Sequence, residues 1–118
     1  MKRYVIKIGI ATEAELRQRS IDIAAGRRHR ERGEPKVWFT SMRAAAEVLS
    51  EKNRELLRIL AKERPESVRE LAELTGRAES NLSRTLKTLA GYGLVRLERE
   101  DKTVRPVARA MEFQIRAV

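Results

Sequence analysis

Apolar and polar side chains alternate near both ends of the chain. In residues 3–10, Tyr4, Ile6, Ile8 and Ile10 occupy every second position. A period of two with β-branched side chains is typical of a strand. Residues 111–118 alternate in the same way. The pattern therefore predicts one β-strand at each end of the chain.

Between these ends, the apolar side chains follow helical spacing and are interrupted by capping and stop signals. Thr12 and Glu15 form a capping box that opens a helix ending near Ala25. Pro65 ends a later helix, because proline cannot continue the helical hydrogen bonding. After the first helix, four more are expected, at residues 42–49, 51–64, 67–75 and 79–90. Ser41, Ser50 and Ser67 are the expected N-caps of the first three of these.

Gly76 breaks the leucine pattern between the last two expected helices. Glycine adopts left-handed dihedrals at low cost, so it suits the end of a helix. After GYGLV the period changes to two from Val95, with a turn at residues 100–102 and a return strand from Thr103 to Val107. This pattern predicts a β-hairpin.

A helix, a short glycine turn, a second helix and a hairpin make up a winged helix-turn-helix arrangement. Ala72 allows the two helices to approach closely, Gly76 turns the chain, and Leu82 fills the space between the helices. The second helix then directs outward the polar side chains Ser80, Asn81, Ser83, Arg84, Lys87 and Thr88. Such a helix fits the major groove of B-DNA, where Asn, Arg and Lys meet base edges and phosphates. A purely structural helical hairpin is the alternative.

The charge of the chain favours a polyanionic partner. Its 118 residues carry a formal charge of +9. Such a charge attracts polyanions over long distances and gains from counterion release. Residues 77–109 contain eight basic and four acidic side chains, a net of +4. Glu98, Glu100 and Asp101 of the hairpin repel phosphate, and a generically basic surface is the alternative interpretation.

Residues 26–36, GRRHRERGEPK, predict a basic linker without an apolar anchor. Both a solvated hinge and a nonspecific phosphate-binding arm agree with this composition. The expected division is an interaction segment at residues 1–25, this linker, and a DNA-binding domain with a C-terminal strand at residues 37–118. The expected fold class is mainly α with a small β component, a winged helix-turn-helix preceded by an N-terminal strand and helix.

Residues 50–105 resemble the winged-helix domain of the MarR-like transcriptional regulators in the stretches SVRELAELTG, SNLSRTLKTL and GYGLV. A longer stretch, from VWFTSMRAAAEVLSEKNRELLRIL to MEFQIRAV, resembles small prokaryotic DNA-binding proteins that are similar to antitoxins repressing their own toxin operon. The resemblance implies a sequence-specific regulator, acting as a repressor on double-stranded DNA. The chain departs from the family pattern at Ala78, which supplies no capping side chain, and at the hairpin tip, which lacks glycine.

The expected DNA contacts come from three parts of the chain. The second helix and the turn before it supply most of them, the start of the preceding helix touches the DNA backbone, and the hairpin reaches flanking phosphates. The candidate residues are Ser67, Arg69, Arg77, Ser80, Asn81, Ser83, Arg84, Lys87, Thr88, Arg99, Lys102 and Arg105.

The two terminal strands and the N-terminal helix are expected to form the interface of a homodimer, because exposed strand edges invite pairing. The alternative is an N-terminal segment that docks on its own domain or stays disordered. Two rival functions remain open. One is an antitoxin that neutralises a small toxin through protein contacts, and the other is a winged helix that binds RNA or only protein.

The composition argues against an enzyme and against a metal or cofactor site. One histidine and no cysteine cannot assemble a zinc site or a Cys/His nucleophile pair from the usual ligands. No nucleophile-elbow or phosphate-loop pattern surrounds the serines. No apolar run approaches the roughly 18 to 20 residues that span a bilayer, and the start lacks the apolar region of a signal peptide. We expect a cytoplasmic protein.

Overall fold

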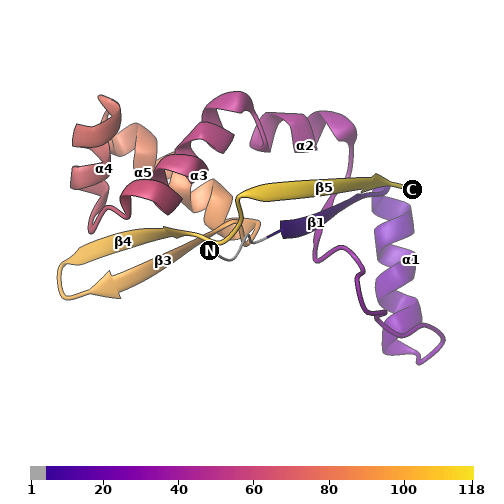
Figure 1. The fold of residues 1–118 in the computed structure, drawn as a ribbon. Helices are drawn as coiled ribbons and strands as arrows, with labels where there is room; N and C mark the ends of the chain where they lie inside the picture. The colour runs from indigo at the N-terminus through magenta and orange to yellow at the C-terminus, as the bar shows by residue number, and fades with distance from the viewer. Residues whose placement is uncertain (1–4) are drawn as a thin grey trace.

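The computed structural model describes residues 5–118, which form an elongated molecule of 49 × 29 × 29 Å. Figure 1 shows α4, α5 and the β3–β4 hairpin at one end of it and α1 at the other. In chain order, the elements are β1 (Val5–Ile10), α1 (Glu13–Ala24), β2 (Val37–Phe39), α2 (Met42–Val48), α3 (Glu51–Glu63), α4 (Val68–Thr75), α5 (Glu79–Gly91), β3 (Val95–Glu100), β4 (Thr103–Ala108) and β5 (Glu112–Ala117).

The strands β2, β1 and β5 form a parallel sheet with β1 at its centre. Ile8 of β1 lies in register with Val37 of β2 and with Ile115 of β5. The two terminal strands expected from the sequence therefore pair with each other within one chain, and residues 3 and 4 of the first lie outside the described part. The N-terminal segment docks on its own chain.

The expected fold class underestimates the β content. The described residues form five helices and five strands, and three of these strands make a parallel sheet. The sequence gives no signal for β2, because VWF is too short to show a period of two. Parallel pairing joins segments that are far apart along the chain, so local patterns do not specify it. The helices and the hairpin lie where the sequence predicts them.

One face of the sheet packs into the same apolar core as the helices. Ile8, Ile10 and Phe39 of this face are buried. The ring of Phe39 stacks on Tyr92, directly after α5, with a centroid distance of 4.5 Å. Leucines of the helical part complete the core, namely Leu56, Leu57, Leu60, Leu71, Leu82, Leu86, Leu89 and Leu94. This continuous core links the sheet to α5.

The other face of the sheet carries Trp38, which lies over Gly9. A Cβ atom at position 9 would lie 2.4 Å from Cζ3 of Trp38, so only glycine fits there. The guanidinium carbon of Arg19 in α1 lies 5.1 Å from the centroid of the Trp38 ring, in cation–π geometry. None of the described residues of α1 is fully buried. The Arg19–Trp38 contact therefore fixes a helix that has almost no core of its own.

The loop at residues 26–36, expected to be a linker, is anchored at its end. Glu34 accepts hydrogen bonds from Arg19 and from Arg28. The bond from Arg19 is the main reason that the pKa of Glu34 lies below its ordinary value. The N–H of Lys36 donates a 3.2 Å hydrogen bond to the carbonyl of Lys7. The loop therefore returns to the sheet at a defined position.

The predicted N-caps are confirmed. The Thr12 hydroxyl accepts the N–H of Glu15, and the Glu15 carboxylate accepts the N–H of Thr12. Ser41, Ser50 and Ser67 each accept a backbone N–H three residues later. These bonds satisfy N–H groups that helix starts otherwise leave without partners.

Candidate nucleic-acid interface

The turn between α4 and α5 begins at Gly76, which adopts left-handed dihedrals, φ 73° and ψ 10°. Its N–H donates a 2.8 Å hydrogen bond to the carbonyl of Ala72. Only residues 76–78 separate the two helices. As the sequence predicts, α5 begins without a side-chain cap at Ala78. The glycine therefore redirects the chain within three residues.

Helix α5 has an apolar face and a polar face on opposite sides. Leu82, Leu86 and Leu89 are buried in the core. Arg84 is two residues from both Leu82 and Leu86, about 200° around the helix axis, and is exposed. We call the exposed residues around it the outer face of α5: Ser80, Asn81, Arg84, Lys87 and Thr88. All five are candidate contacts from the sequence, whereas the sixth candidate of this helix, Ser83, is half-buried.

Hydrogen bonds within α5 and its turn order part of the outer face. Nη2 of Arg77 donates a 2.9 Å hydrogen bond to Oδ1 of Asn81. Oγ1 of Thr88 donates to the carbonyl of Arg84 at 3.2 Å. Arg84 and Lys87 remain exposed on the middle of the face. Arg84 and Lys87 therefore lie between Asn81 and Thr88, whose side chains already form hydrogen bonds within the chain.

The start of α4 supplies two further candidates, Ser67 and Arg69. The hydroxyl oxygen of Ser67 accepts the N–H of Glu70 at 3.0 Å, which leaves its own proton free to be donated. Arg69 is exposed in the first helical turn. Phosphates are favourable at helix N-termini, because unpaired N–H groups and the helix dipole attract negative charge. The geometry thus suits backbone contacts at this position.

The hairpin places its basic candidates in two different environments. Asp101 and Lys102 form the turn, and Asp101 has φ 52°, in the left-handed region that favours glycine. Arg99 and Lys102 are exposed close to this tip. Arg105 is half-buried and lies in register with Glu98. Arg99 and Lys102, but not Arg105, therefore belong to the exposed tip.

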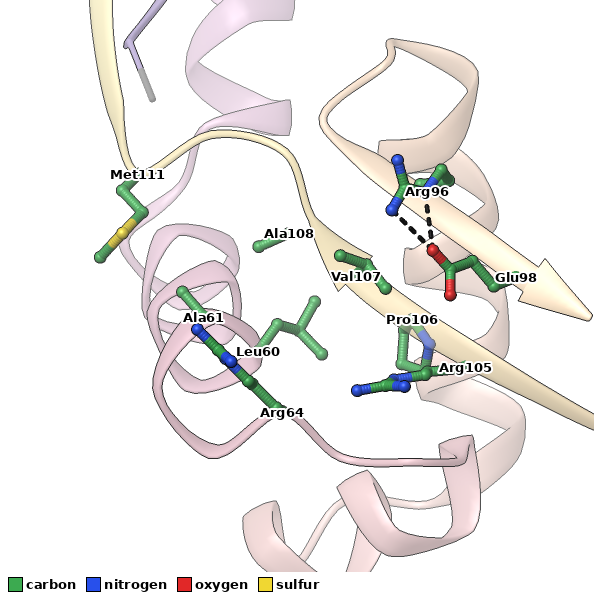
Figure 2. Close-up of a pocket in the computed structure, with 10 residues that line it drawn as sticks. All are labelled: Leu60, Ala61, Arg64, Arg96, Glu98, Arg105, Pro106, Val107, Ala108 and Met111. Atoms are coloured by element: carbon green, nitrogen blue, oxygen red, sulfur yellow. Dashed lines mark hydrogen bonds and ion pairs between the residues drawn. The ribbon is translucent and has the colours of Figure 1, made fainter. Parts of the chain in front are cut away.

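Arg105 lines a cavity of about 350 Å³ between the end of α3 and β4 (Figure 2). Arg64, directly after α3, lines the same cavity. Within it, Nη2 and Nε of Arg96 donate to the same carboxylate oxygen of Glu98, at 2.6 and 2.9 Å. Arg96 therefore neutralises the charge of Glu98, one of the hairpin acids that would repel a phosphate. Arg64 is not among the candidates expected from the sequence. The one sequence feature that points to it is its position at the end of a helix, directly before Pro65.

Within residues 5–118, no group of three or more acidic or histidine side chains is placed to hold a metal ion. None of the helices in the same range has the length and apolar character needed to cross a membrane.

A known protein family matches the part of the chain that contains α3, α4, α5 and the hairpin. No curated protein matches the chain. The model of the HVO_A0114 family matches residues 48–115, from the end of α2 into β5. The match includes the whole outer face of α5 and the hairpin, and it covers more than half of the chain. The chain belongs to the HVO_A0114 family.

Proposed function

We propose that the chain is a winged helix-turn-helix regulator, similar to the MarR-like family, that binds double-stranded DNA and represses transcription. The observation that carries the proposal is the outer face of α5, which is exposed directly opposite three buried leucines. An α-helix with its side chains is about 10–12 Å in diameter, and the major groove is about 12 Å wide. A helix such as α5, with 13 residues, therefore fits into the groove.

Each residue of the outer face has a chemistry that duplex DNA can use. Arg84, at the centre, presents the planar guanidinium that pairs with guanine O6 and N7. Asn81 presents a carboxamide, the group that pairs with adenine N6 and N7. Lys87 and Ser80 reach phosphates or neighbouring base edges. In this proposal, Arg84 and Asn81 read sequence, and the other two fix the position of the helix.

Basic side chains outside α5 hold the DNA backbone. Arg69 at the start of α4 precedes α5 in sequence, and Arg99 and Lys102 at the hairpin tip follow it. All three side chains are exposed. A cation that neutralises a phosphate releases counterions, so each contact adds about 0.9 to the slope of log affinity against log salt. In this proposal, the slope of DNA affinity against salt concentration therefore measures the number of phosphate contacts.

The test is DNA binding by the purified chain. Duplexes are selected from a random library, and the Kd of the selected duplex is compared with that of a shuffled duplex at several salt concentrations. The double variant Arg84→Ala/Lys87→Ala is expected to weaken specific binding by about 100-fold, since a base contact contributes about 1–3 kcal/mol. Its Tm should stay close to that of the wild type, because both side chains are exposed.

The control is Arg17→Ala/Lys62→Ala, which removes the same charge from exposed positions on α1 and α3. It is expected to change affinity by less than threefold. An equal loss in both double variants would reduce the binding to general electrostatic attraction and would reject the assigned face. Selection of no duplex, with tight binding of RNA or of a co-purified small protein, would favour one of the rival functions.

A further inference from the structure

The outer edge of β5 has backbone groups without a strand partner in the described part of the chain. β5 pairs with β1 on one side and is the last strand of the sheet. The N–H of Val118 donates to the carbonyl of Ile10 at 2.9 Å, so even-numbered residues of this strand direct their backbone groups toward β1. The N–H and C=O groups of Phe113, Ile115 and Ala117 therefore point outward. An edge of this kind is a template for another strand.

Apolar side chains are exposed beside this edge. Ile115 is 50% exposed, and Met111, just before the strand, is 41% exposed. Met42 of α2 is 58% exposed. These three residues and Phe113 line one groove of about 440 Å³ between α2 and β5. Parallel sheets are normally covered on both faces, so a surface like this calls for a partner.

We infer that the partner is a second copy of this chain, whose β5 pairs antiparallel with β5 around a two-fold axis at Gln114. The strand is complementary to itself about this residue. Glu112 comes to lie opposite Arg116 of the second copy, and Phe113 lies opposite its Ile115. Each relation occurs twice, as two-fold symmetry requires. Opposite charges and apolar pairs across neighbouring strands each contribute favourably to pairing.

The backbone geometry selects this register. Only alternate residues direct their N–H and C=O groups outward, so the possible two-fold registers differ by two residues. In one neighbouring register, Glu112 faces Gln114 and Arg116 faces Ala110. In the other, Glu112 faces Val118 and Arg116 faces Gln114. The register centred on Gln114 is thus the one that pairs the two charges.

The same register places the charges where side chains approach most closely. Even-numbered residues of β5 bond to β1, so across the new interface they form non-hydrogen-bonded pairs, with Cα atoms about 4.5 Å apart. Glu112, Gln114 and Arg116 all belong to this set. The odd-numbered residues form the hydrogen-bonded pairs on the side of α2, where Phe113 and Ile115 extend the groove, which Arg54 and Arg58 of α3 also line. The result is one sheet of six strands in the order β2-β1-β5-β5-β1-β2.

This inference goes beyond DNA binding and does not depend on it. If both hold, the two-fold axis presents two α5 helices, and the selected DNA site has two inverted halves. The two proposals fail separately, because the oligomeric state is measured without DNA.

A charge swap tests the pairing. Sedimentation of the wild-type chain at micromolar concentration should give twice the 13.6 kDa of one chain. Arg116→Glu should give a monomer, since it sets two carboxylates against each other at both ends of the interface. Glu112→Arg/Arg116→Glu should restore the dimer. Circular dichroism and Tm confirm that each variant is folded. A monomeric wild type, or a double variant that fails to dimerise while folded, would overturn the inference.

A cysteine at the axis gives an independent readout, because the chain contains no cysteine. In Gln114→Cys, the two thiols lie in a non-hydrogen-bonded pair, whose Cα separation of about 4.5 Å falls inside the disulfide range of roughly 4.4–6.8 Å. Mild oxidation should yield a covalent dimer of this variant. Ser20→Cys, on the exposed surface of α1, is the control and should stay monomeric under the same conditions. Equal cross-linking of the two variants, or none in Gln114→Cys, would reject the interface and leave the edge to a different protein.

Discussion

Nη2 of Arg77 donates a 2.9 Å hydrogen bond to Oδ1 of Asn81 across the junction of the turn and α5. Arg77 is half-buried, and its Nε has no hydrogen-bond partner within residues 5–118. The bond occupies one acceptor position of the Asn81 amide and directs its Nδ2 group to the other side. Arg77 is therefore a positioning residue for a side chain that reads DNA in the proposed function.

Arg77→Ala should weaken binding to the selected duplex by about threefold to tenfold, in line with one hydrogen bond of about 0.5–1.5 kcal/mol. Because Arg77 acts through Asn81, the two variants should not be additive. The double variant Arg77→Ala/Asn81→Ala is expected to bind as weakly as Asn81→Ala, within about twofold. Full additivity in this double-mutant cycle would show that Arg77 contacts DNA on its own.

The helical part of the fold and the exposed face of α5 could be predicted from local signals. Ser67 marks the start of α4, Gly76 marks its end, and the spacing of Leu82 and Leu86 decides which side of α5 faces outward. Each signal lies within one or two turns of the residue that it positions. The environment of Arg105 could not be predicted, because the cavity depends on Arg64 from a helix distant in sequence.

Gly76→Ala should lower the free energy of unfolding by about 1–2 kcal/mol, the cost of left-handed dihedrals for a residue with a Cβ. Within residues 5–118, and apart from its two chain neighbours, no heavy atom lies within 4 Å of where this Cβ would be, so the cost is conformational and not steric. Gly76→Asn is the matched variant and should lose less, since asparagine tolerates this region better. Urea denaturation measures the free energy of unfolding of the wild type and of both variants. A larger loss for asparagine than for alanine would contradict the conformational explanation.

The sheet shows where local reasoning ends. Ile6, Ile8 and Ile10 predict a strand, but nothing near them indicates that the neighbours are residues 37–39 and 112–117. The same holds for Trp38, whose two contacts, Gly9 and Arg19, come from different elements. Long-range pairing decides these contacts, and a single sequence carries no pattern for it.

Gly9→Ala should destabilise the chain by about 1–3 kcal/mol, the usual cost of an added group in a filled space. The new methyl would lie 2.4 Å from Cζ3 of Trp38, and the aromatic ring would have to move. Trp38 is the single tryptophan, so its fluorescence reports the movement directly. Gly91→Ala is the control, because outside its own helix backbone and chain neighbours no heavy atom of the described residues lies within 4 Å of its Cβ position at the end of α5. It should raise stability by up to about 1 kcal/mol, and a comparable loss in both variants would contradict the steric argument.

The pairing of Glu34 with Arg19 makes the stability of the N-terminal segment depend on pH. The hydrogen bond from Arg19 holds the pKa of Glu34 below its ordinary value of 4.5, and the bond from Arg28 acts in the same direction. The folded chain therefore binds the Glu34 proton less tightly than the unfolded chain does. Its contribution to stability is complete above pH 4.5 and is lost as the pH falls through the lowered pKa.

Glu34→Gln should therefore be less stable than the wild type at pH 7, and the difference should shrink as the pH falls below 4.5. Both partners are largely shielded from solvent, with side-chain exposures of 15% for Arg19 and 13% for Glu34, so salt should screen the effect only in part. Urea denaturation between pH 7 and pH 3, followed by Trp38 fluorescence, measures the difference. Glu31→Gln removes an exposed carboxylate from the same loop, and the part of the change that it reproduces is due to net charge. A difference between Glu34→Gln and the wild type that stays constant down to pH 3 would show that the ion pair does not stabilise the contact of α1 with this loop.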